Sequence, residues 1–83
     1  MSLTLQPVRV ANGFDEDGVL VFSEGRLVAV LVRLSDDNEV APGDWFLEAG
    51  FGRVGSVDHP TFPDLKAAQD WIAERLGLAP AQP

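Results

Sequence analysis

His59 is the only histidine in the sequence and the side chain best suited to proton transfer. It follows Asp58, so a carboxylate–imidazole pair for acid–base chemistry could form from two neighbouring residues. A catalytic triad or a multi-histidine metal site needs partners that one histidine and no cysteine cannot supply. A lone histidine before Pro60 is more typical of an exposed loop. The sequence therefore favours a chain that is not an enzyme, with no catalytic residue.

Residues 50–57, Gly-Phe-Gly-Arg-Val-Gly-Ser-Val, match the glycine-rich pattern of nucleotide-binding loops. In a dinucleotide-binding fold such a loop opens a helix, whereas a segment containing prolines follows it here. A kinase also needs a strand lysine, but the only lysine, Lys66, falls in a segment with helical periodicity. We interpret the glycines as the end of a strand and a turn, and expect no cofactor.

Two acidic clusters, at residues 15–18 and 36–39, resemble fragments of calcium-binding loops. A complete loop needs alternating oxygen ligands, a central glycine and a bidentate glutamate at its twelfth position. Neither cluster supplies that set, so both are interpreted as solvated turns and we expect no metal site.

Trp45 and Trp71 are the largest side chains of the sequence. Packing between a helix and a sheet is the ordinary role for residues of this kind. The alternative is a candidate pocket near Trp45 and Trp71, which would make the chain a small-molecule-binding domain.

The elements that must position these residues form one domain, residues 1–83, because this length leaves no room for a second core. Asp64 and Gly77 stand where the N-cap and the C-terminal glycine of a helix belong. The expected elements are a strand at 7–11, a β-hairpin at 19–34, a strand at 44–51, a helix at 64–76 and a frayed tail at 78–83. This order predicts an α+β fold, with an antiparallel sheet of three to four strands and one C-terminal helix packed on one face.

The hairpin is apolar on both of its faces. A two-residue turn at Glu24-Gly25 would pair Val21 with Val28, and strict alternation then separates two sets of side chains. One set is Leu20, Phe22, Leu27, Ala29 and Leu31, and the other is Val19, Val21, Val28, Val30 and Val32. In the following strand, alternation places Trp45, Leu47, Ala49 and Phe51 on one face.

A single helix covers only one face of such a sheet, so the other face needs a partner. We expect a second copy of the chain in a homodimer, with the candidate interface formed by Val19, Val21, Val28, Val30 and Val32. Another protein could take the same place. The alternative is internal cover, by the N-terminal segment or by residues 52–63 through Val54, Val57 and Phe62.

Charge and composition exclude several classes of function. Thirteen acids against six scattered bases give a net charge of −7, which disfavours nucleic acids and anionic membranes. The longest apolar run, residues 27–32, is far shorter than the ~20 residues of a membrane span. Absence of cysteine fits a reducing compartment, so we expect a cytoplasmic location.

The closing segment, residues 61–72, resembles the ending of many small bacterial proteins of unknown function. The resemblance rests on Phe62, Leu65, Ala68, Trp71 and Ile72, and implies a capped amphipathic helix packed on a sheet. The sequence thus favours a small acidic, non-enzymatic, homo-oligomeric protein-binding or accessory domain. A small-molecule-binding domain is the alternative, and a small enzyme comes third.

Overall fold

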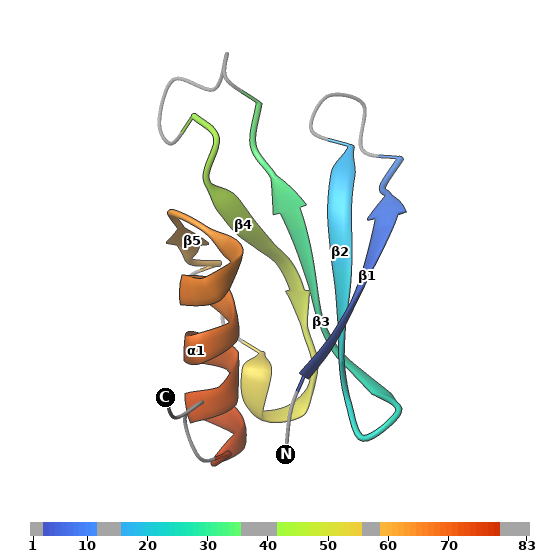
Figure 1. Ribbon diagram of the computed structural model, residues 1–83, viewed down its shortest axis with the longest axis vertical. Coiled ribbons are helices and arrows are strands. Elements are labelled where there is room, and N and C mark those ends of the chain that lie inside the picture. The colour runs from blue at the N-terminus through green and yellow to red at the C-terminus, as the bar shows by residue number, and fades with distance from the viewer. Residues whose placement is uncertain (1–2, 12–15, 36–41, 56–58, 79–83) are drawn as a thin grey trace.

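One antiparallel sheet and one helix make up the computed structural model, which describes residues 3–11, 16–35, 42–55 and 59–78. The strand order follows the sequence, β1-β2-β3-β4-β5, and α1 comes last (Figure 1). The elements are β1 (Leu3–Arg9), β2 (Asp17–Ser23), β3 (Arg26–Arg33), β4 (Trp45–Gly50), the short 3-10 helix η1 (Gly52–Val54), β5 (Thr61–Phe62) and α1 (Leu65–Leu76). This confirms the predicted α+β class, with five strands in place of three or four.

Regular structure extends beyond the prediction in two segments, one at β1 and one within residues 52–63. β1 begins before the predicted strand at 7–11 and includes Pro7, which an edge strand tolerates because one side of its backbone needs no partner. Residues 52–63, expected to be irregular, contain η1 and the two-residue strand β5. β5 pairs with the first two residues of β4 and so extends the sheet below the helix.

α1 begins and ends at the predicted signals. The Asp64 carboxylate accepts a hydrogen bond of 2.8 Å from the backbone N–H of Ala67, and Gly77 ends the helix in a left-handed conformation, with φ 75°. Ala68 and Ile72 are fully buried on the face towards the sheet. Within the part of the chain that the structure describes, no helix has the length and apolar character needed to cross a membrane.

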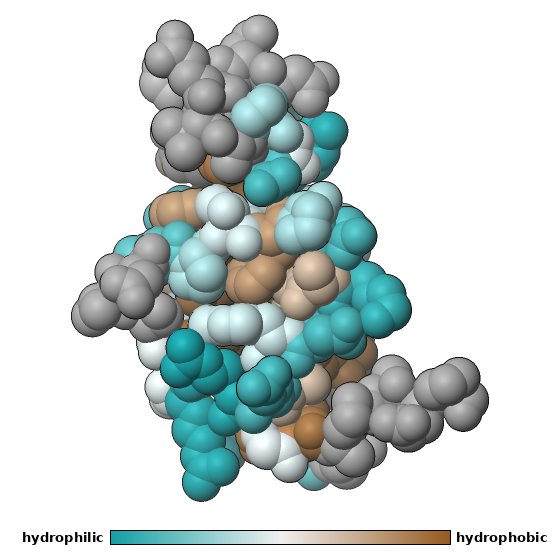
Figure 2. All heavy atoms as spheres, turned by 90° about the vertical axis from the view of Figure 1, so that its left-hand side faces the viewer, coloured by the Kyte–Doolittle hydropathy of each residue, from teal (hydrophilic) through white to brown (hydrophobic). Residues whose placement is uncertain are grey.

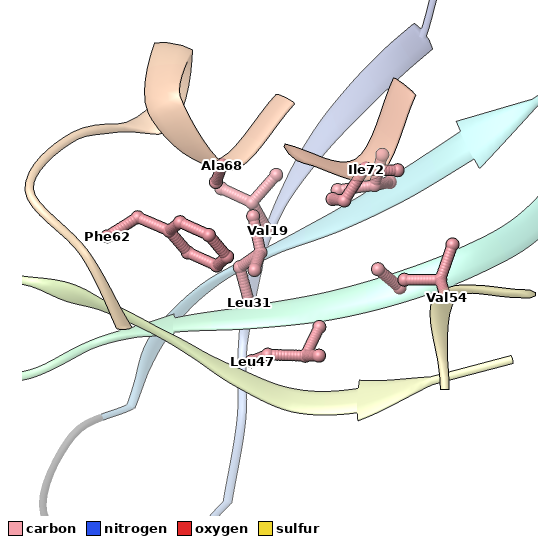
Figure 3. Packing of buried hydrophobic residues seen from close by; sticks show 9 residues of the cluster. Val19, Leu31, Leu47, Val54, Phe62, Ala68 and Ile72 are labelled. Carbon is pink, nitrogen blue, oxygen red and sulfur yellow. The ribbon is translucent and has the colours of Figure 1, made fainter. Parts of the chain in front are cut away.

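The core lies between the sheet and α1. Figure 3 shows side chains from the sheet, η1 and α1 converging there, with Phe62 from β5 and Val54 from η1 packed beneath Ala68 and Ile72 of α1. The buried cluster is Val19, Val21, Ala29, Leu31, Leu47, Val54, Phe62, Ala68 and Ile72. Val54 and Phe62 therefore fill the helix side of the sheet, so the expectation that they cover the opposite face is wrong. Val57 lies outside the described residues.

The β2–β3 hairpin turns at Glu24 and Gly25, as predicted, and both residues have positive φ, 52° and 78°. The first two pairs beyond the turn, Ser23 with Arg26 and Phe22 with Leu27, are also confirmed. Beyond them a β-bulge shifts the register, so that Val21 pairs with Ala29 and Val28 is the extra residue.

This bulge corrects the predicted faces. After it, Val19 and Val21 share the core with Ala29 and Leu31, and Val28 packs against the same cluster. Three of the five residues of the candidate interface therefore point to the helix side. Only Val30 and Val32 remain on the opposite face. The physical reason is that one extra residue inverts the alternation of a strand for every residue beyond it.

A second bulge lies between β3 and β4. Val30 pairs with Ala49 and Leu31 with Leu47, which leaves Glu48 as the extra residue of β4. Ala49 therefore lies on the face opposite to Leu47, and the expectation that both share the face of Trp45 is wrong for Ala49. Each bulge inserts one residue on one strand only, so Leu31 and Leu47 meet as a buried pair.

Replacing Asp64 by Ala removes the side-chain acceptor at the start of α1. We expect the free energy of unfolding to fall by about 1 kcal/mol, because the N–H of Ala67 loses its partner. Urea unfolding followed by circular dichroism measures the change. Asp70→Ala is the control: it removes an exposed carboxylate from the same helix, which forms only the 2.9 Å ion pair with Lys66. A loss for Asp64→Ala no larger than that of the control would show that the cap does not stabilise the helix.

Candidate functional site

The face of the sheet away from α1 carries apolar side chains from three strands. We call six of them the open patch: Leu20, Phe22, Leu27, Val30, Phe46 and Ala49. Their positions follow from the pairing, because Leu20 lies opposite Val30 and Val30 lies opposite Ala49. Leu27 is 37% exposed and the other five are half-buried. No member belongs to the buried cluster against α1.

One end of this face is covered from within the chain. A Cβ atom placed on Gly18 would lie only 2.8 Å from a methyl group of Val10, so the end of β1 folds closely over this glycine. Gly18 pairs with Val32, which is only 1% exposed. The predicted cover by the N-terminal segment therefore exists at the Gly18–Val32 end, and Val32 is not part of the open patch.

Polar residues border the open patch. Thr4 and Gln6 of β1 are exposed beside Phe22 and Leu20, and the bulged residue Glu48 is exposed on β4. Of these three bordering residues, only Glu48 is charged. A patch with an apolar centre, a polar border and little charge has the composition of a protein–protein contact surface.

His59 stands at the border of the same face. Its ring stacks on Phe46, with centroids 5.7 Å apart, and its Nδ1 donates a 2.9 Å hydrogen bond to the carbonyl of Leu47. The residue is exposed and has a left-handed backbone, with φ 45°. These contacts anchor the loop before β5 to β4. Asp58, the other half of the suggested acid–base pair, lies outside the described residues.

The helix side of the sheet has a groove of about 690 Å³ at the end where α1 begins. In Figure 1, α1 stands beside β4 and β5, whereas β1 and β2 lie at the other edge of the sheet. The groove is lined by Pro7, Val8, Arg9, Asp17, Gly18, Val19, Trp45 and Leu65. Pro7 pairs with Val19, so these two side chains point to the helix side together and form part of its apolar wall.

Only one of the two tryptophans suggested for a pocket lines this groove. Trp45 does so, together with Leu65 from the first turn of α1. Trp71 packs between Phe62, with ring centroids 5.5 Å apart, and the guanidinium of Arg75, whose carbon lies 4.6 Å from the indole. The structure thus places the two tryptophans at different sites.

The polar end of the groove is an ionic cluster that the sequence did not reveal. Arg9 forms a 3.0 Å ion pair with Glu16 and lies 3.7 Å from Asp17. Arg9 and Asp17 face each other because β1 and β2 are antiparallel neighbours. The side chains of Arg9 and Asp17 are 73% and 70% exposed, so water weakens their attraction. The sequence could have indicated this cluster only if β1 had been predicted at its full length and paired with β2.

The glycine-rich segment has a structural explanation. A Cβ atom on Gly50 would lie 2.5 Å from the carbonyl oxygen of Val54, so only glycine lets η1 fold back against the end of β4. Gly52 adopts a left-handed conformation with φ 59°. The segment positions Val54 in the core, in agreement with its interpretation as a turn.

Among residues 3–11, 16–35, 42–55 and 59–78, no three acidic or histidine side chains gather in a way that could hold a metal ion. Most of the two acidic clusters, residues 15 and 36–39, lies outside these ranges. The side that carries α1 is a mosaic of hydrophilic residues and smaller hydrophobic areas (Figure 2). On α1, Lys66 donates a hydrogen bond to Asp70, which raises the pKa of the lysine.

Comparison of the chain with family models, with curated proteins and with solved structures found no match.

Val21→Ala and Val30→Ala test the two faces with one type of substitution. Val21 is fully buried, so its loss should lower the free energy of unfolding by about 2–3 kcal/mol through lost burial and a cavity. Val30 is half-buried on the open patch, and we expect a loss below about 1 kcal/mol. Urea unfolding at low protein concentration measures both while limiting any contribution from association. Equal losses would contradict the bulged register, which alone separates these two valines.

Proposed function

We propose that this chain is a non-enzymatic, homo-oligomeric protein-binding or accessory domain, in which the open patch packs against a second copy. The single observation that carries the proposal is an apolar sheet face that α1 does not cover. Antiparallel sheets with one solvated face normally alternate apolar with polar residues, whereas Leu20, Phe22 and Val30 occupy that face here. A location in the cytoplasm is part of the same proposal, and the absence of cysteine is compatible with it.

The size of the face supports a modest interface. Four strands spaced by about 4.8 Å and about 20 Å long give β1 to β4 a projected area of about 400 Å². A typical interface removes about 800 Å² from each partner, roughly a seventh of the 5421 Å² accessible surface of this chain. The apolar patch supplies part of this area, so the polar border must supply the rest. We therefore expect a dissociation constant on the order of micromolar.

The distribution of charge favours a second copy of the chain at this face. A net charge of −7 opposes self-association over most of the surface. None of the six residues of the open patch is charged, and Glu48 lies at its border where water can solvate it. Two such faces can therefore meet about a two-fold axis with little repulsion.

The observed packing weakens the alternative to a partner, in which other parts of the chain cover this face. Val54 and Phe62 are committed to the core on the helix side, and Val10 reaches only the Gly18 end of the open face. These contacts leave the centre of the patch, at Val30, without cover from the apolar residues suggested for that role and described here.

Sedimentation equilibrium tests the proposal. Over a range from about 1 µM to about 1 mM, the wild-type mass should rise from 8.9 kDa to twice that value. Val30→Lys should keep the chain monomeric throughout, because two lysines would face each other in an apolar contact. Glu74→Gln, on the exposed side of α1, changes the net charge by the same amount and should dimerise like the wild type.

Leu27→Lys is a second variant, in case Val30→Lys does not fold. Leu27 is already 37% exposed, so a lysine is tolerated there more readily than at Val30. It should weaken the dimer while leaving the circular dichroism spectrum unchanged. A wild-type chain that remains at 8.9 kDa over the whole range would contradict the proposal.

A further inference from the structure

β1 forms an edge of the sheet that no other strand of the described residues pairs with. In an antiparallel pair, alternate residues direct their N–H and C=O groups to the neighbouring strand, and the residues between them direct these groups away from it. The N–H of Val10 donates a 2.7 Å hydrogen bond to the carbonyl of Glu16, whereas Pro7, opposite Val19, has no N–H to donate. The even-numbered residues of β1 therefore bond to β2, and the backbone groups of the odd-numbered residues point to the free edge.

This edge lacks most of the features that usually protect a sheet from further strands. Natural edges are shortened, bent, or occupied by charged residues and proline. The opposite edge is protected in this way, because β5 has only two residues and His59 Nδ1 bonds to the carbonyl of Leu47 next to it. β1 has seven residues, and residues 3–8 carry no charge. Pro7 alone interrupts its row of outward N–H groups.

The two faces of β1 differ in polarity. Leu3 and Leu5 are half-buried on the helix side, where they pack against the buried cluster, and Pro7 on the same side lines the groove. Thr4 and Gln6 are exposed on the opposite face. Residues directly opposite each other in an antiparallel pair share a face. A strand added at this edge would therefore meet apolar side chains with every second residue and polar side chains with the residues between.

We propose that the free edge of β1 binds an extended peptide segment of another protein as an additional antiparallel strand. Outward backbone groups of Leu5, Pro7 and Arg9 hold the segment through hydrogen bonds, and every second side chain of the segment packs beside Leu3, Leu5 and Pro7. The binding preference is thus for an extended segment that alternates apolar with polar residues. This function goes beyond dimerisation and uses none of the six residues of the open patch, so each proposal can fail without the other.

A second copy of the chain fits this edge less well than a peptide. If two β1 strands paired over their length, Pro7 of each copy would leave a carbonyl of the other without a donor. A peptide without proline meets this gap only once. Pro7 therefore disfavours self-association at the edge while leaving the donors of Leu5 and Arg9 available.

An uncharged heptapeptide tests the proposal. It alternates threonine with valine, leucine and valine, has acetyl and amide ends, and carries N-methyl groups on three of its threonines. When the apolar residues lie on the helix side, the threonine N–H groups point away from β1, so methylation leaves the bonds to β1 intact and prevents the peptides from pairing with one another. The full chain with Leu27→Lys is used, so that dimerisation through the open patch does not contribute.

Amide hydrogen exchange followed by nitrogen-15 NMR reads the edge residue by residue. Without peptide, the amides of Leu5 and Arg9 should exchange faster than those of Gln6 and Val8, which bond to β2. At a peptide concentration about five times its dissociation constant, exchange at Leu5 and Arg9 should slow about sixfold.

Two control peptides separate the backbone from the side chains. Moving the three N-methyl groups to the apolar residues blocks the bonds to β1 and should weaken binding at least about tenfold. Replacing the three apolar residues by threonine, with the original methylation, removes burial beside Leu5 and Pro7 and should weaken binding at least about fivefold.

Several outcomes would overturn the proposal. Equal affinities of the two methylated peptides would show that backbone bonding at β1 does not contribute, and equal affinity of the threonine peptide would show the same for its apolar side chains. Unchanged exchange at Leu5 and Arg9 with millimolar peptide would show that the edge does not bind an extended segment. Exchange at these two amides that slows with protein concentration in the absence of peptide would assign the edge to a second copy instead.

Discussion

The two β-bulges around β3 are the constraint on which the rest of the structure depends. On one side Val28 is inserted relative to β2, and on the other Glu48 is inserted relative to β3. Each insertion inverts the alternation of the strand that contains it, and together they bring Val21, Ala29, Leu31 and Leu47 to one side. Without the first bulge, Val19 and Val21 would face away from α1 and the core would lose two of its buried side chains.

The limited size of the single helix explains why both candidate surfaces exist. Twelve residues give α1 a length of about 18 Å, and the helix lies beside β4, β5 and η1 (Figure 1). Val54 and Phe62 fill the space beneath it, so these two side chains serve the core and do not cover the other face. Between the first turn of α1 and the β1–β2 edge, the groove beside Trp45 remains. On the opposite face, the open patch remains.

The two surfaces differ in charge. The open patch is almost free of charge, which suits a symmetric contact between acidic chains. The groove ends at the exposed ion pairs that Arg9 forms with Glu16 and Asp17. Because these surfaces lie on opposite faces of one sheet, a dimer built through the open patch would present its two grooves outward.

Local signals in the sequence were sufficient to predict the α+β class, the hairpin turn at Glu24-Gly25 and the capped helix with its buried Ala68 and Ile72. Caps, turns and helical periodicity depend on neighbouring residues, so they can be recognised without knowledge of the fold. The register beyond the turn could not be predicted, because both faces of β2 and β3 are apolar and alternation gives no preference between them. The groove likewise required tertiary structure, since Arg9, Asp17, Trp45 and Leu65 are distant in sequence and meet only through strand pairing and helix docking. Thus the sequence by itself determined the hairpin, the strand at β4 and the helix, whereas long-range packing decided the length of β1, the formation of η1 and β5, and which side chains are buried.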